Sequence, residues 1–240
     1  MQTFEEFVEK MLDMWSKYPD FHIYHYAPYE QTAIKKLAGR QRMHPDVCSF
    51  ISELFYEGRL SPAAGNERQN VNAKGRLSGT GLRFVAVNHT GNQNESIEEV
   101  ETISNLVNEL LDGESNWTNR KGEALNLTLD DILIVTPYNA QVSALRDVLP
   151  KGAHVGTVDK FQGQEAPVIF FSIASSTAAD APRGMEFLYS SNRLNVAISR
   201  ARCIAVLVAS PALFEMECKS PRQMMLANAF CSFFERAQAL

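Results

Sequence analysis

The sequence of 240 residues is long enough for one domain, or for one large domain with an appendage, and its 45% of apolar residues can fill a sizeable core. A short peptide hormone and a disordered tail are therefore excluded. The 23 basic and 28 acidic residues leave a formal net charge of −5, so the chain does not coat nucleic acid non-specifically, and any contact with nucleic acid must be local.

Cysteines and apolar runs indicate the compartment. The four cysteines lie far apart without a C-x-x-C pair, which indicates neither a zinc site nor a secreted disulfide framework. No apolar run approaches the ~18 to 20 residues of a membrane span, and the acidic amphipathic start shows no signal peptide. We therefore expect a cytoplasmic protein with no membrane partner and no bound metal of its own.

The first part of the chain predicts two helices with a strand between them. Apolar residues from Phe4 to Trp15 repeat at helical spacing, so we expect an amphipathic helix that ends near Pro19. The aromatic and β-branched residues 21–26 predict a strand, and residues 30–37 predict a second helix.

After Gly39 the pattern changes. Pro45 can occupy the first turn of a helix that ends at Gly58, and His44 is suited either to capping this helix or to bonding the turn around Arg42. The polar residues 61–81 are typical of a loop.

From Leu82 onward, strands and helices alternate. A capping pair, Ser96 and Glu99, opens a predicted helix with Ile97, Val100, Ile103, Val107 and Leu110 on its inner face. Continuous apolar strands such as VIFFSIA favour a parallel sheet that is covered on both faces. The pattern predicts a doubly wound α/β domain with strands over 82–87, 131–136, 155–158, 168–174 and 204–209 and later helices carrying Val142, Leu145 and Val148 and spanning 194–201 and 221–237.

Three segments carry residues suited to chemistry: TPYNAQ (136–141), GTVDKFQGQE (156–165) and NRLNVAISRAR (192–202). Ligands of open parallel sheets bind beyond the carboxyl ends of the strands, so we expect sites just after strands. Taken singly, each segment also has a simpler interpretation, as a strand-to-helix turn, a tight turn at Gly163 or solvated helix charges at Arg200 and Arg202.

Together the segments resemble a known family. GTVDKFQGQEAPVIFFS is similar to motif V, and NRLNVAISRAR to motif VI, of superfamily 1 helicases, closest to the branch that contains the RNA-decay helicases. QRMHPDVCSFISELFYEGRL resembles the start of the second motor domain of that branch, and TPYNAQ a further motif. The resemblance covers residues 40–240 and implies a C-terminal, RecA-like motor domain with a mainly parallel sheet.

The resemblance also implies an ATP site. Arg200 of motif VI and Arg42 of the RMHP segment match arginines that reach the γ-phosphate, where such residues stabilise the transferred phosphoryl group. Nucleotide-binding roles are implied for Glu165, as acceptor for the ribose hydroxyls, and for Gly163, Gln162 and Gln41. At Gln41 the family usually has an aromatic residue, so a ring that stacks on adenine is missing there.

Single-stranded DNA or RNA is the implied partner. Thr157 matches a strand-contacting position of motif V, and Lys160 adds one positive charge beside it. Tyr138 and Asn139 are suited to holding the sugar-phosphate chain or stacking a base.

The sequence has no G-x-x-x-x-G-K-[ST] loop and no Asp-Glu pair of the Walker B type. These features bind the phosphates and magnesium, so we expect ATP and Mg²⁺ to be held only with an N-terminal Walker A motor domain of a longer parent protein, and this chain alone to be inactive.

Residues 1–39 resemble part of the RNase H-like nuclease domain of bacterial RecB-like nuclease-helicase fusions, in which Glu30 would be a metal carboxylate. An ordinary position in the first turn of a helix explains Glu30 better than a metal site does, since no partner carboxylates are identifiable. Two other functions therefore stay open: a non-catalytic nucleic-acid-binding or interaction module, and a remnant of a metal-dependent nuclease.

Overall fold

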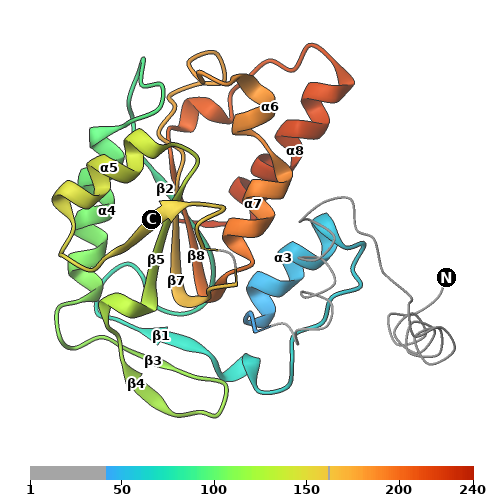
Figure 1. Ribbon diagram of the computed structural model, residues 1–240. Helices are drawn as coiled ribbons and strands as arrows, with labels where there is room; N and C mark the ends of the chain where they lie inside the picture. Colours follow the sequence, from blue (N-terminus) through green and yellow to red (C-terminus); the bar gives the residue numbers. More distant parts are fainter. Residues whose placement is uncertain (1–41, 162) are drawn as a thin grey trace, which may run out of the picture. The chain divides into compact units, whose positions relative to one another are not determined.

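A computed structural model describes residues 42–161 and 163–240 (Figure 1). These residues lie in the second of the two units into which the chain divides, Arg42–Leu240. The predicted helices and strand of residues 1–39 lie outside the described residues.

A six-stranded sheet lies at the centre, with strand order β6-β5-β7-β8-β2-β9. Each neighbouring pair in it is parallel. Its strands are β2 (Gly81–Ala86), β5 (Ile132–Thr136), β6 (His154–Thr157), β7 (Ala166–Ser172), β8 (Ala201–Ala209) and β9 (Gln238–Ala239). Helices cover both faces of this sheet, which confirms the predicted RecA-like, doubly wound α/β fold.

The two faces of the sheet carry separate apolar cores. Helices α4 (Ile97–Leu110) and α5 (Asn139–Val148) cover one face, and α3 (Pro45–Phe55), α7 (Ser191–Ile198) and α8 (Pro221–Arg236) cover the other (Figure 1). Strand β7 serves both cores, because Val168 and Phe170 belong to the first and Ile169 and Phe171 to the second. Burial on both sides explains why this strand is apolar at nearly every position.

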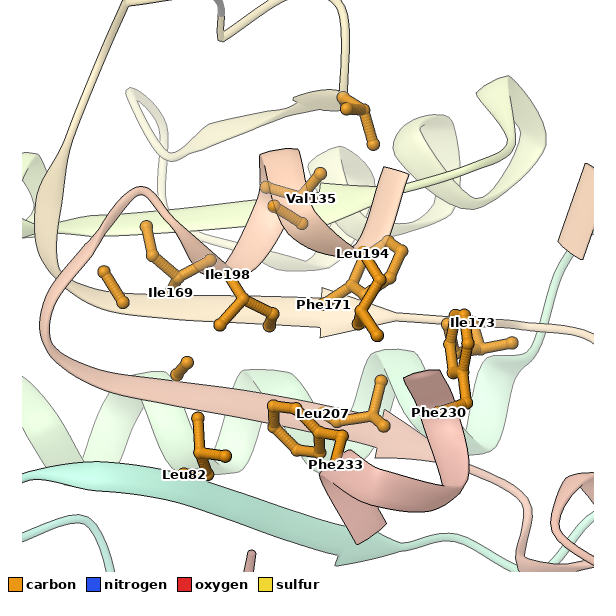
Figure 2. Packing of buried hydrophobic residues seen from close by; sticks show 14 of the residues in the cluster. Leu82, Val135, Ile169, Phe171, Ile173, Leu194, Ile198, Leu207, Phe230 and Phe233 are labelled. Carbon is orange, nitrogen blue, oxygen red and sulfur yellow. The ribbon is translucent and has the colours of Figure 1, made fainter. Parts of the chain in front are cut away.

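Figure 2 shows the second core at close range. Phe171 and Ile169 of β7 lie beside Leu194 and Ile198 of α7. Phe233 of α8 completes this layer beside β8, and its ring meets Phe50 of α3 edge to face at 5.5 Å between centroids. The helices that carry the RMHP and motif VI segments are thus fixed to one face of the sheet.

Local sequence signals account for the starts of helices α3 and α4. His44 caps α3, since its Nδ1 accepts from the amide of Asp46 at 3.2 Å, which answers the open question about His44. Ser96 caps α4 by accepting from the amide of Glu99. Ile97 was wrongly predicted to face inward: it is 53% exposed, because side chains lean toward the helix start and Ile97 has no preceding turn to contact.

Short polar strands form a second sheet that the sequence did not reveal. Strand β1 (Asn70–Asn72) lies within the predicted loop 61–81 and pairs antiparallel with β3 (Asn116–Thr118), which pairs with β4 (Ala124–Asn126). Val71 and Trp117, paired across β1 and β3, are buried, yet each stands alone among polar residues. Such brief alternation gives no strand signal, so the loop prediction was wrong at β1.

The remaining elements are short. They are the 3₁₀ turns η1 (Asn66–Arg68), η2 (Leu129–Asp131) and η3 (Pro211–Leu213) and the helix α6 (Gly184–Leu188). In Figure 1 the small sheet β1-β3-β4 and helix α6 lie at opposite ends of the large sheet. No helix within residues 42–161 and 163–240 has the length and apolar character needed to cross a membrane.

Candidate functional site

The end of the large sheet where β7 and β8 begin, here called the amino edge, brings three distant segments together. Ala166 of β7 pairs with Ala201 of β8, so the residues before them, Glu165 and Arg200, are neighbours. The amide of His44 donates to the carbonyl of Arg202 at 2.8 Å, which draws the RMHP segment to the same place.

Glu165 lies between two arginines at this edge. Its Oε2 is 3.5 Å from Nη1 of Arg42 and 3.7 Å from Nε of Arg202. The side chain of Arg42 is 60% exposed, while those of Glu165 and Arg202 are 29% exposed. Within the described part of the chain, the buried Oε2 of Glu165 accepts no hydrogen bond, so the two arginines hold it by charge and its acceptor capacity is unused.

Arg200 is buried beside this group. Its Nη1 donates to the carbonyl of Gln164 at 3.3 Å and its Nη2 to that of Val158 at 3.5 Å. Burial lowers the pKa of Arg200 to about 10, against the opposing effect of Glu165 and Asp159, so its guanidinium is charged at neutral pH. Two long hydrogen bonds therefore fasten this cation to the motif V segment.

Of the three other residues predicted to bind nucleotide, the structure describes only Gly163. Gly163 has a φ of +85°, a left-handed conformation that favours glycine, although a Cβ there would meet no atom within 4 Å. The backbone, not close contact, thus requires this glycine. Gln41 and Gln162 lie outside the described residues.

At the opposite end, here called the carboxyl edge, β5, β6 and β7 terminate. Thr157 is the last residue of β6, and exposed Asn139 is the first of α5 after β5. The ring of Tyr138 is buried, with its hydroxyl accepting from Ser175 Oγ at 3.2 Å, and burial raises its pKa. Tyr138 is thus packed into the edge and does not present an open ring face.

The side chain of the exposed Lys160 folds back onto β6. Its Nζ donates to the carbonyl of Val155 at 3.2 Å and lies 5.8 Å from the ring centroid of Phe161. The charge that the sequence placed beside Thr157 is therefore directed back onto β6.

As expected, TPYNAQ and GTVDKFQGQE begin at the carboxyl ends of β5 and β6, and NRLNVAISRAR opens the helix before β8. The predicted ligand residues nevertheless do not all lie at one end of the sheet. Glu165 and Arg200 precede β7 and β8, and in a parallel sheet the residues before strands lie at the end opposite to those after them. The structure therefore separates the predicted residues into a group at the amino edge (Arg42, Gly163, Glu165 and Arg200) and one at the carboxyl edge (Tyr138, Asn139 and Thr157).

A buried polar network supports the carboxyl edge, and the sequence did not indicate it. Glu99 of α4 is fully buried, and its Oε2 accepts from Ser172 Oγ at 2.6 Å and from the amide of Ala174 at 3.0 Å. Its Oε1 lies 3.1 Å from Nε2 of His89, whose Nδ1 lies 2.7 Å from Ser176 Oγ. The carboxylate thus ties α4 to the loop after β7.

Gln141 takes the place that a capping box would give to Glu99. In a capping box, Glu99 would accept from the amide of Ser96. That amide instead donates to Oε1 of Gln141 at 2.8 Å, while Nε2 of Gln141 donates to Ser172 Oγ at 2.9 Å. Because Gln141 of the TPYNAQ segment bonds this amide, the side chain of Glu99 can turn into the interior. No local sequence pattern reveals this exchange of roles.

Within residues 42–161 and 163–240, no group of three or more His, Cys, Asp or Glu side chains is placed to hold a metal ion. At the amino edge, the exposed Arg42 offers a cation and the partly exposed Glu165 a carboxylate. A cation suits phosphates and a carboxylate suits hydroxyl groups.

Comparison with known proteins identifies the family of this domain. Residues 21–212 match the family described as AAA domain. The chain is 31% identical over 189 residues to Helicase sen1 of Schizosaccharomyces pombe, covering 72% of this chain and 10% of that protein. It is 28% identical over 232 residues to Probable RNA helicase armi of Drosophila melanogaster, covering 85% of this chain and 18% of that protein.

A third relative is DNA polymerase alpha-associated DNA helicase A of Schizosaccharomyces pombe, 32% identical over 175 residues, with 67% of this chain and 26% of that protein covered. The chain thus spans between 10% and 26% of the length of these three curated relatives. With the six-stranded parallel sheet, these matches show that the chain belongs to the AAA domain family and is a RecA-like domain of the superfamily 1 helicase type.

Proposed function

We propose that this chain is the C-terminal motor domain of an ATP-dependent helicase and that its amino edge is one half of an ATP site. The observation that carries the proposal is the convergence of Arg42, Glu165 and Arg200 from three distant segments. A Walker A domain of the parent protein would supply the other half.

Each residue at the amino edge has a distinct task in this proposal. Arg42 is exposed and reaches outward to the γ-phosphate, while the partly exposed carboxylate of Glu165 receives the ribose hydroxyls. Arg200 leaves its long bonds to the carbonyls of Val158 and Gln164 when a phosphate replaces them as a partner for its charge. ATP would supply the phosphoryl group, and Mg²⁺ would compensate part of its charge. The arginines would stabilise the negative charge that develops on the phosphoryl group during transfer.

Single-stranded DNA or RNA would bind at the carboxyl edge, near Asn139 and Thr157. The two names "RNA helicase" and "DNA helicase" among the relatives support nucleic acid in general and do not choose between the two. The buried network around Glu99 ties α4 to the loop after β7 at this edge, which would hold the contacting residues in a fixed arrangement.

The division into a nuclease-derived segment, residues 1–39, and a motor domain, residues 40–240, stays a prediction. The AAA domain match begins at residue 21, inside the first segment, and Glu30 lies outside the described residues. A cytoplasmic location is likewise part of the proposal.

The test is hydrolysis of ATP by a protein that joins this chain to its Walker A domain. Arg200→Ala should lower the rate by ~10³ to 10⁵ while largely sparing nucleotide binding, because the arginine acts on the transferring phosphoryl group. Arg76→Ala, which removes an exposed arginine paired with Glu109, is the matched control and should leave the rate unchanged. Normal turnover by the Arg200→Ala protein would overturn the assignment.

A further inference from the structure

Helix α6 and the start of α7 form an arginine-aromatic cluster beside Tyr138. The guanidinium carbon of Arg183 lies 4.2 Å from the ring centroid of Phe187, and that of Arg193 lies 4.0 Å from the same centroid. The ring of Phe187 is in turn 5.5 Å from that of Tyr138, tilted by 37°. Two cations therefore share one aromatic side chain at the carboxyl edge.

Neither arginine has an anionic partner among the described residues. Within residues 42–161 and 163–240, the side chains of Arg183 and Arg193 form no ion pair and donate no hydrogen bond, and their packing is against Phe187. The acidic residues near them are engaged elsewhere: Asp180 accepts from Thr177 Oγ1 at 2.6 Å, and Glu186 pairs with Arg222 at 2.7 Å. Two uncompensated like charges in one place repel each other, and a bound anion would relieve this repulsion.

The surrounding structure holds the cluster in place. Leu188 and Tyr189, which follow Phe187, are buried, and the hydroxyl of Tyr189 donates to the carbonyl of Leu213 at 2.7 Å. Ser190 caps α7 by accepting from the amide of Arg193. Arg183 is exposed and Arg193 half-buried, so the cluster is anchored from behind and open in front.

We propose that Arg183, Phe187 and Arg193 form a contact site for single-stranded nucleic acid, which extends the strand path proposed near Asn139 and Thr157. Guanidinium groups bind phosphates through charge-assisted hydrogen bonds, and their planes stack on bases. The net charge of −5 requires any nucleic-acid contact to be local, and this cluster supplies a local concentration of positive charge next to an aromatic ring. The site rests on the proposed function and deepens it.

The experiment is the binding of fluorescent single-stranded DNA and RNA of about 12 nucleotides, measured by anisotropy over a range of salt concentrations. Arg183→Ala and Arg193→Ala should each weaken binding about tenfold, and each should reduce the slope of log K against log salt by about 0.7. Arg193→Lys should keep the salt slope and still weaken binding, because the charge remains and the stacking plane is lost. Arg76→Ala changes net charge equally at an unrelated exposed position and should bind as the unmodified chain.

The outcomes separate this site from the wider proposal. Binding that Arg183→Ala and Arg193→Ala leave unchanged, with folding verified by circular dichroism, overturns this site and leaves the proposed function standing. Failure of the unmodified chain to bind either oligonucleotide at low salt overturns both this site and the proposed strand path. Equal binding of a poly-glutamate peptide to the same arginines overturns the assignment to nucleic acid. Preference between the DNA and RNA arms identifies which strand the site takes.

Discussion

The two ends of the large sheet are built differently. At the carboxyl edge, the buried carboxylate of Glu99 accepts hydrogen bonds from Ser172 and Ala174 at 2.6 and 3.0 Å. At the amino edge, the carboxylate of Glu165 lies 3.5 and 3.7 Å from its two arginines and is partly exposed. The buried carboxylate at the carboxyl edge is satisfied internally, whereas the one at the amino edge has an oxygen without a hydrogen-bond partner among the described residues.

This difference teaches where to look for the chemistry. Buried polar groups that are fully satisfied stabilise and fix a structure, whereas unsatisfied ones call for a reason outside the chain. Arg200 Nε and Glu165 Oε2 both lack a hydrogen-bond partner within the described residues, and both lie at the amino edge. These unpartnered groups support the proposal that the amino edge is one half of a shared site.

The largest expected effect is on the stability provided by the buried network at the carboxyl edge. Glu99→Ala should lower the free energy of unfolding by about 3 to 5 kcal/mol, because it removes one partner of a buried pair and leaves His89 and the Ser172 hydroxyl without their acceptor. Urea denaturation monitored by circular dichroism measures this loss. Glu101→Ala, at an exposed position of the same helix, is the control and should change stability by less than about 0.5 kcal/mol. Equal losses in the two variants would show that the network does not support this edge.

The next effect concerns pH at the amino edge, where Cys203 follows Arg202 on β8. Burial raises the pKa of its thiol from 9.0 to about 12, with Arg202 opposing this shift and Asp131 adding to it. Between these values the unfolded chain loses the thiol proton and the folded chain keeps it, so stability is fully present below pH 9 and falls as pH rises toward 12. The expected contribution is about 1.4 kcal/mol per pH unit.

Thermal unfolding between pH 8 and 11 measures this slope. Burial also raises the pKa of Tyr138, Tyr189 and Cys48, which adds to the decline, whereas the lowered pKa of Arg200 opposes it above about pH 10. Cys203→Ala should therefore flatten the slope but not abolish it. An unchanged slope would mean that the thiol is not shielded from water.

The smallest expected effect comes from the amino edge itself. Glu165→Gln should lower the free energy of unfolding by less than about 1 kcal/mol, because partly exposed ion pairs at these distances contribute little. Urea denaturation alongside Glu99→Ala provides the comparison. A loss as large as that of Glu99→Ala would contradict the contrast between the two edges.

Much of the fold could be predicted from the sequence, because its long apolar strands and capped helices carry strong signals. Strands β7 and β8 are apolar along most of their length, and Pro45 and Ser96 mark the starts of α3 and α4. The small sheet β1-β3-β4 could not be predicted, since strands of three residues with a single buried side chain show no periodicity.

For the site, the family resemblance implied two groups of residues, but the sequence alone did not place them at opposite ends of the sheet. The register that pairs Ala166 with Ala201 decides that Glu165 meets Arg200 at the amino edge, and register is a property of the assembled sheet. The burial of Glu99 and of Tyr138 likewise depends on tertiary contacts with Ser172 and Ser175. The cluster of Arg183 and Arg193 around Phe187 required the unpredicted helix α6.

The most direct test of the central claim is ATP hydrolysis by this chain with Mg²⁺ and single-stranded DNA, first alone and then with the Walker A domain of its parent protein supplied. The half-site account predicts no turnover by the chain alone, and turnover that depends on Arg200 when the second domain is present. DNA-stimulated turnover by the chain alone, surviving purification controls and the Arg200→Ala substitution, would contradict it.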